Sequence, residues 1–92
     1  MADVEATLIE RGQRYGKFTG HAHVSQSIQR IMTTHDEAKW NSMDTDQKEA
    51  LFMIAHKIGR IINGDPDYAD SWVDIAGYAK LVSDRLEENI ER

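Results

Sequence analysis

The presence of a single proline in 92 residues is the feature that most constrains what this chain can fold into. Proline interrupts helices, and few segments of the chain alternate apolar with polar residues as half-buried strands do. Apolar residues instead recur at spacings of three and four, which places them on one face of a helix. The sequence therefore predicts an all-α fold, a small bundle of about four helices that forms one domain over residues 1–92.

The expected helices divide this domain into two parts. Residues 1–43 hold two shorter helices and a loop, and residues 44–92 hold two longer helices. The four helices are expected at about 3–13, 19–33, 44–63 and from 67 onward. Because the connection at Gly64-Asp65-Pro66 is short, the last two helices are expected to pack antiparallel as a helical hairpin. The apolar residues expected to be buried there, in the domain or in a subunit interface, are Leu51, Ile54, Ile58, Ile61, Trp72, Ile75, Ala79 and Val82.

The net charge and the absence of cysteine indicate the kind of compartment and the kinds of partner to expect for this chain. Sixteen acidic against eleven basic residues give a net charge of −5, so nucleic acid is not an expected partner. The chain has no cysteine for disulfides or thiolate metal sites, which fits a reducing compartment. It has neither a signal peptide nor an apolar run of the roughly 20 residues that span a bilayer. We expect a cytoplasmic protein without a membrane partner, and a homo-oligomer, because so small a domain gains stability by association.

Three carboxylates are candidate ligands for a divalent cation. Asp70 and Asp74 are four residues apart and therefore project from the same helix face. Two carboxylates so placed repel each other, and a hard cation such as Mg²⁺ would turn that repulsion into coordination. Glu49, on the preceding helix and on the face that carries His56, is the third candidate.

Basic residues on the third expected helix lie at the same height along the hairpin as acidic residues on the fourth. Counting outward from the turn places His56 and Lys57 level with Asp74, and Arg60 nearer Asp70. In the functional interpretation Lys57 and Arg60 donate to phosphate oxygens, and His56 is a ligand or a proton-transfer group. In the alternative interpretation the two aspartates neutralise Lys57 and Arg60 in ion pairs that lock the hairpin.

The turn at residues 15–20 is a further candidate for ligand contact. Tyr15 and Phe18 are aromatic residues in a glycine-containing turn, where aromatic rings sometimes stack on a base; in the alternative they cover the core beside the first helix. Lys17 stands between them and is a candidate to contact an anionic ligand. His21 and His23 are two residues apart and face different ways, so a metal shared by them is not expected.

The second half of the chain resembles a known group of proteins. The runs 49–61, 64–66 and 70–81 resemble small phage and prophage proteins whose hairpin is similar to that of the MazG-like all-α nucleoside triphosphate pyrophosphohydrolases. The resemblance to the phage group extends to residues 11–18. It implies an enzyme of the bacterial host's cytoplasm that splits a nucleoside triphosphate between its α and β phosphates. It also implies Mg²⁺ held by carboxylates on two facing helices, and a dimer or tetramer.

The acidic pattern of these enzymes is only partly present. They pair a Glu-x-x-Glu on one helix with a Glu-x-x-Asp on the next; Asp74 matches the final Asp, but Ser71 stands three residues before it. Met53 and His56 stand where the Glu-x-x-Glu should fall. The resemblance thus implies Asp74, Asp70 and Glu49 as catalytic residues of an incomplete set, with nucleotide binding expected before hydrolysis.

Two other functions are compatible with the sequence. One is a non-enzymatic phage accessory protein that sequesters a nucleotide signal or binds a host protein. The other is a structural oligomeric helical module. An enzyme needs at least three carboxylates converging on one cleft, whereas a binding module needs basic residues around a cavity with too few acids for a metal.

Overall fold

A computed structural model describes residues 3–92 of the chain as five α-helices without a strand. The helices are α1 (Val4–Tyr15), α2 (Phe18–Thr34), α3 (Glu37–Ser42), α4 (Thr45–Asn63) and α5 (Ala69–Glu88). The all-α prediction is confirmed, and the additional helix, α3, lies in the segment that was expected to be a loop. Within residues 3–92, the helices are too short or too polar to cross a bilayer.

Polar side chains start the helices where the sequence places them. Asp3 caps α1 by accepting a hydrogen bond from the backbone N–H of Ala6, at 3.1 Å. Asp36 caps the short α3 in the same way, through the N–H of Lys39 at 3.0 Å. At α4 the side chain of Gln47 accepts from the N–H of Asp44, at 2.9 Å, which is half of a capping box.

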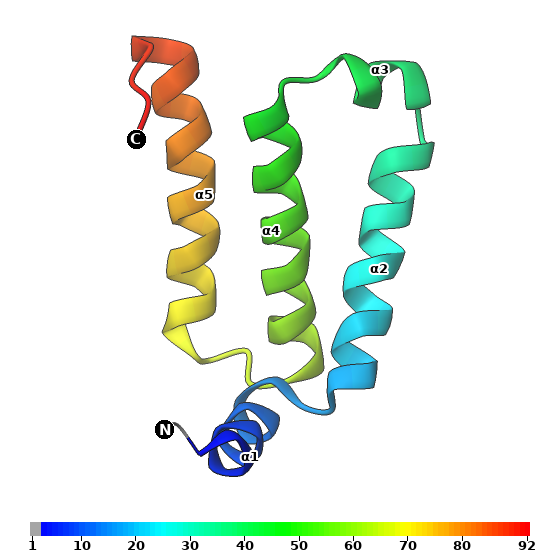
Figure 1. The fold of residues 1–92 in the computed structure, drawn as a ribbon, viewed down its shortest axis with the longest axis vertical. Helices are drawn as coiled ribbons and strands as arrows, with labels where there is room; N and C mark the ends of the chain where they lie inside the picture. Colours follow the sequence, from blue (N-terminus) through cyan, green and yellow to red (C-terminus); the bar gives the residue numbers. More distant parts are fainter. Residues whose placement is uncertain (1–2) are drawn as a thin grey trace.

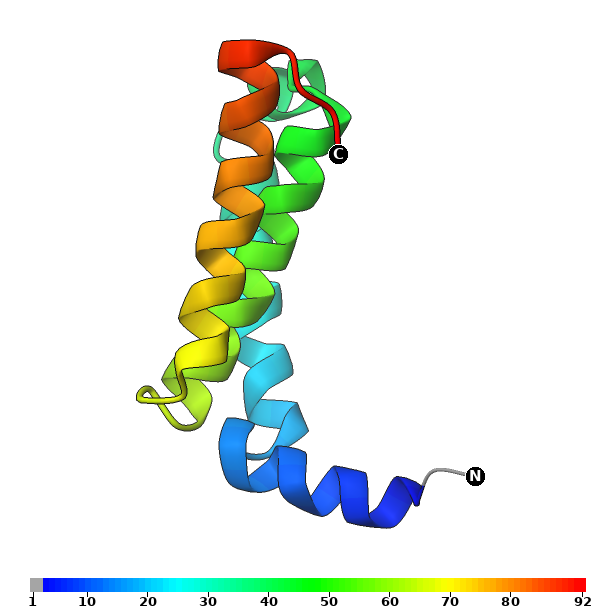
Figure 2. The ribbon, with the colours of Figure 1, turned by 90° about the vertical axis from the view of Figure 1, so that its left-hand side faces the viewer.

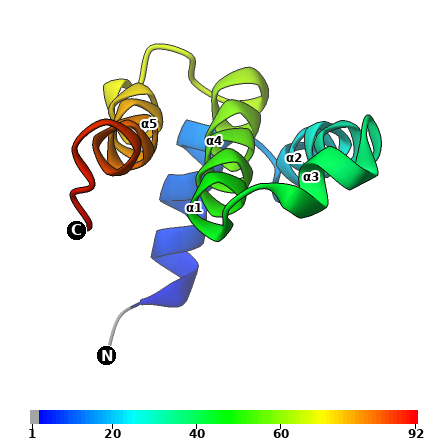
Figure 3. The same ribbon diagram turned by 90° about the horizontal axis from the view of Figure 1, so that it is seen from above.

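Three helices form a layer one helix thick. Helix α4 lies in the middle, with α2 on one side and α5 on the other, and Figure 3 shows the three in a row. The colours of Figure 1 run down α4 and up α5, so the chain reverses direction at residues 64–68. Helix α1 crosses the end of the layer and extends away from one of its two faces (Figure 2). The layer therefore has one face beside α1 and one face without it.

A layer this thin leaves the apolar residues only shallowly buried. Among residues 3–92 the buried apolar residues are the small Ala50 and Ala55, and no large side chain is fully buried. Of the residues expected to be buried, Leu51, Trp72 and Ala79 are exposed in the single chain, and the others are half-buried. These three residues are therefore not buried within one chain, since no other described helix is stacked over this side of α4 and α5; their burial in a subunit interface stays a prediction.

Candidate functional site

Lys57 and Arg60, which were expected to share a partner, point in different directions. Lys57 faces α5, where its Nζ lies 2.8 Å from Oδ2 of Asp74, and only 11% of its side chain is exposed. Arg60 faces α1 instead, and its guanidinium lies over the ring of Tyr15, 4.2 Å from the ring centre. The ion-pair interpretation therefore describes Lys57 and Asp74, while Arg60 has no ion pair within residues 3–92.

The three candidate carboxylates are not brought together. Asp74 is paired with Lys57, and Asp70 accepts a hydrogen bond from the hydroxyl of Tyr68 at 2.9 Å, which raises the pKa of Tyr68. Glu49 belongs to the start of α4, at the opposite end of the α4–α5 pair from Asp70 (Figure 1). In the described part of the chain, no three histidine or acidic side chains lie close enough together to hold a metal ion. The residues present therefore do not fit a Mg²⁺ site within one chain.

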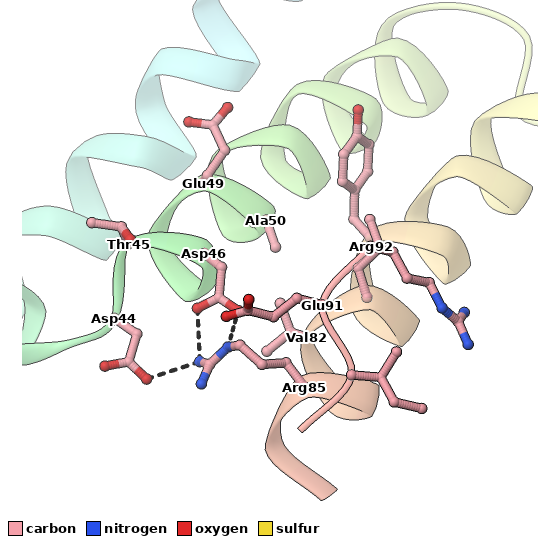
Figure 4. A pocket seen from close by; sticks show the side chains of 12 residues that line it. Asp44, Thr45, Asp46, Glu49, Ala50, Val82, Arg85, Glu91 and Arg92 are labelled. Atoms are coloured by element: carbon pink, nitrogen blue, oxygen red, sulfur yellow. Dashed lines mark hydrogen bonds and ion pairs between the residues drawn. The ribbon is translucent and has the colours of Figure 1, made fainter. Parts of the chain in front are cut away.

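Glu49 lies instead beside a clamp that joins α4 to α5. A cavity of about 570 Å³ lies there. Figure 4 shows the guanidinium of Arg85 between Asp44 and Asp46, with Glu49 turned away from it. The Nη2 atom of Arg85 is 2.8 Å from Oδ2 of Asp44 and 2.7 Å from Oδ1 of Asp46. Hydrogen bonding to Arg85 lowers the pKa of Asp46, and the two carboxylates raise that of Arg85. These acids are occupied in a structural contact.

A second cavity, of about 580 Å³, lies where α1, the start of α2 and the end of α4 meet. Its lining contains three cations, Arg11, Lys17 and Arg60, and no carboxylate among the residues described. It also contains two aromatic rings and two histidines: Tyr15, Phe18, His21 and His56. We call this space the basic cavity. It collects four of the five residues predicted to bind a ligand, namely Tyr15, Lys17, His56 and Arg60, and leaves out Lys57.

Asn63, the last residue of α4, holds the wall of the basic cavity in place. Its Nδ2 donates to the carbonyl oxygens of Tyr15 and Lys17, at 2.8 and 2.9 Å. Gly16 between them has φ +76°, and a Cβ there would collide with Asn63. The N–H of Asp65 adds a bond to the carbonyl of Arg14 at 2.6 Å. The end of α4 is thus fastened to the turn that precedes α2.

His21 and His56 form a contact on the cavity wall. Nε2 of His21 is 3.2 Å from Nδ1 of His56, and the rings meet edge to face with their centres 4.4 Å apart. Burial, together with His21, Arg60 and Lys57, lowers the pKa of His56 to about 4. Burial and the charge of Arg60 lower that of His21 as well. At neutral pH both rings are therefore uncharged, and one donates a hydrogen bond to the other.

A family model described as a domain of unknown function, DUF6378, matches residues 2–86. The chain belongs to the DUF6378 family. No curated protein and no solved structure matches it. All the residues that line the basic cavity, and Asn63 behind it, lie inside the part of the chain that the DUF6378 model covers.

Sequence reasoning missed three residues of this DUF6378 site. Arg11 stands in the run 11–18 that carries the resemblance to phage proteins, but it was not singled out as a ligand contact. His21 was considered only together with His23; its true neighbour is His56, 35 positions away. Asn63 was not singled out as a residue of the site. A signal for the histidine contact was present in Gly59, since a Cβ there would lie 3.0 Å from Nδ1 of His21.

Proposed function

We propose that this DUF6378 domain binds a small phosphate-bearing ligand of the nucleotide type in the basic cavity. The observation that carries the proposal is the lining, which gathers three cations and no described carboxylate in a chain of net charge −5. In so acidic a chain, local gathering of cations in a concave space favours an anionic ligand. The volume of about 580 Å³ lies within the range of small-molecule sites.

The phosphate end of the ligand is assigned to the cations. Arg11, Lys17 and Arg60 approach the cavity from α1, from the turn and from α4. Guanidinium groups bind phosphate oxygens through paired hydrogen bonds, and lysine adds a mobile point charge. Helix α2 begins beside them without a side-chain cap, so its first N–H groups add a favourable dipole for an anion.

The base end is assigned to Phe18. Its side chain lines the cavity although 76% of the residue is exposed, so its ring is free to stack on a planar ligand group. The ring of Tyr15 already carries the guanidinium of Arg60 on one face, which orients that cation. In the neutral pair, Nε2 of His21 and Nδ1 of His56 bond each other and Nδ1 of His21 is buried against Gly59, so Nε2 of His56 is the nitrogen assigned to the ligand between the two ends.

The proposal is for binding without hydrolysis. Pyrophosphohydrolysis of the MazG-like kind needs several carboxylates around Mg²⁺, whereas Asp74 is paired with Lys57 and Glu49 lies at the far end of α4. We propose that the chain shares the α4–α5 arrangement of MazG-like proteins as an inheritance and retains ligand binding. Of the functions compatible with the sequence, sequestration of a nucleotide signal agrees best with a cavity of this composition.

Thermal shift with a panel of nucleotides tests the proposal. Nucleoside mono-, di- and triphosphates, cyclic nucleotides and inorganic phosphate are added to the full chain, once with EDTA and once with Mg²⁺. A ligand present at 100 times its Kd stabilises the folded state by about 2.7 kcal/mol. We expect a nucleotide to raise the melting temperature by the corresponding amount in the presence of EDTA. Arg60→Gln is expected to remove it.

Arg30→Gln is the matched control, because Arg30 is an exposed arginine of α2 that does not line the cavity. The control variant should keep the full shift. A panel without any shift, or an equal loss of the shift in both variants, contradicts the proposal. A shift that requires Mg²⁺ favours the metal-dependent alternative.

A further inference from the structure

One face of the three-helix layer is apolar and uncovered. Lys57 faces α5 and Gly59 lies against His21 of α2, so Ile58 between them projects from one face of the layer. His56 and Arg60, two positions to either side, project from the opposite face, where the basic cavity lies. The layer therefore has a ligand-facing side and a side that carries Ile58.

The Ile58 side is formed by two helices. On α4, Leu51 and Ile62 lie at helical spacing from Ile58 and therefore share its side of the layer. On α5, the same side carries Trp72, Ala79 and Leu86, whereas Arg85 and its contacts with α4 lie toward the other side. We call these six residues the apolar face. Ile62 is 67% exposed and Trp72 is 55% exposed. The indole N–H of Trp72 donates to the carbonyl of Pro66 at 2.8 Å, so its polar atom is already satisfied.

The apolar face carries no charge along its whole length. By helical azimuth the residues on this side are Gln47, Leu51, Ile54, Ala55, Ile58, Ile61 and Ile62 on α4, and Ser71, Trp72, Ile75, Ala76, Ala79, Val82, Ser83 and Leu86 on α5; three of them are polar and none is charged. At its margin Lys57 and Asp74 neutralise each other. Leu51, Ile62, Trp72, Ala79 and Leu86 are exposed on this side and Ile58 is half-buried among them; an exposed apolar surface without charge is typical of an interface between proteins.

The size of the surface matches a dimer. Helix α4 has 19 residues and is therefore about 28 Å long; two adjacent helices of about 10 Å diameter give the apolar face roughly 560 Å², and α2 beside them brings this whole side of the layer to roughly 800 Å². Stable dimers bury about 800 Å² per partner. No large side chain within residues 3–92 is fully buried, so the single chain lacks the core that a second layer would provide.

We infer that two copies of this chain pack their apolar faces against each other about a twofold axis, with α4 and α5 of each copy forming the centre of a helical bundle. A twofold interface uses the same patch on both copies, and a copy of the chain supplies a surface equally free of charge. The basic cavities lie on the outer faces of this dimer. The dimer therefore leaves both cavities open to ligand and does not depend on the proposed function.

Sedimentation velocity of the full chain over a range of concentrations tests the inference. The expected mass at micromolar concentration is twice 10.5 kDa. Ile62→Lys, which puts a charge in the apolar face, is expected to raise the dissociation constant at least a hundredfold. Val73→Lys is the matched control: Val73 is 64% exposed on α5 but lies outside the apolar face, and its variant should remain a dimer.

A spin-label measurement covers the case in which Ile62→Lys fails to fold. The chain has no cysteine, so a nitroxide attached through Ala79→Cys or through Val73→Cys is the single label on each copy. The distance between the two labels at position 79 should be clearly shorter than the distance at position 73. The inference would be overturned by a monomer at every concentration, or by dissociation of the dimer in Val73→Lys but not in Ile62→Lys. It would also be overturned by the reverse order of the two label distances, or by a chain that stays monomeric and binds to lipid vesicles.

Discussion

Replacing Asp74 with asparagine distinguishes a structural carboxylate from a metal ligand. Oδ2 of Asp74 lies 2.8 Å from Nζ of Lys57, whose side chain is only 11% exposed. Asparagine keeps the shape of the side chain but removes its charge, so the ammonium group of Lys57 is left largely buried without a counter-ion. If Asp70 and Asp74 instead formed a metal site, removing one of two like charges would relieve repulsion and leave stability unchanged.

The loss of unfolding free energy that we expect for Asp74→Asn lies between two limits. Removing one partner of a fully buried ion pair costs about 3–5 kcal/mol, and exposed pairs contribute about 0–1 kcal/mol. The side chain of Asp74 is 46% exposed, so water replaces part of the lost interaction, and we expect a loss of about 2 kcal/mol. For a domain of this size that corresponds to a fall in melting temperature of roughly 8–16 °C.

Urea denaturation followed by circular dichroism, at pH 7 and fixed protein concentration, measures this loss. Asp70→Asn is the control, because within residues 3–92 the one polar contact of its carboxylate is with the hydroxyl of Tyr68 at an exposed position, and it should cost less than about 0.5 kcal/mol. Lys57→Met should also cost less than Asp74→Asn, since it leaves behind a half-exposed carboxylate that water can solvate. A loss below about 0.5 kcal/mol for Asp74→Asn, or the reverse order of the two variants, would refute the ion-pair argument.

Three further predictions concern the basic cavity. Asn63→Ala removes two hydrogen bonds to the turn and should lower the free energy of unfolding by about 1–3 kcal/mol; an unchanged urea midpoint would contradict this. Gly16→Ala should lower the melting temperature markedly, because of its positive φ and the collision with Asn63, whereas Gly12→Ala, in open space within α1, should raise stability by about 0.5–1 kcal/mol. If both variants shift the melting temperature alike, the argument fails. The pKa of His56 is lowered from 6.5 to about 4, so the folded chain binds fewer protons than the unfolded chain; stability should be full above about pH 6.5 and fall as the pH drops toward 4. After allowance for solvent screening the loss is on the order of 1 kcal/mol, and it should be smaller in His56→Gln when urea midpoints at pH 7 and pH 5 are compared.

The helices were largely predictable because each of the long ones is marked by local signals. Asp3 caps α1, Asp44 precedes α4 and Asn63 ends it, close to the limits of 3 and 44–63 that were expected for these helices. Helix α3 was missed because six residues are too few to show a periodic apolar pattern. At Trp72 the sequence left open whether the cover comes from the same chain or from a partner, because an apolar stripe on a helix does not show which; within one chain Trp72 is 55% exposed.

Four residues that line the basic cavity could be singled out from the sequence, but their arrangement in space could not. Lys57 and Arg60 are close in azimuth on one helix, yet Lys57 meets α5 and Arg60 meets α1, and the position of α1 depends on tertiary contacts of Asn63 and Asp65. Glu49 shares a helix face with His56 but lies about 10 Å further along the axis, seven residues at 1.5 Å each. The sequence suggested that Glu49 and His56 belong to one cluster because they share a helix face, but their distance along the helix axis does not allow it.

Helix α1, which buries none of its residues, forms one wall of the basic cavity. It is attached to the rest of the domain mainly through the turn that Asn63 holds, so opening it costs less free energy than separating α4 from either of its neighbours. We therefore expect α1 to act as a gate for the proposed ligand: the rate at which α1 opens would set how quickly the ligand enters the cavity and how long it stays. A bound ligand that contacts Arg11 would fasten this helix to the layer, and slower hydrogen exchange of the α1 amides would record its occupancy.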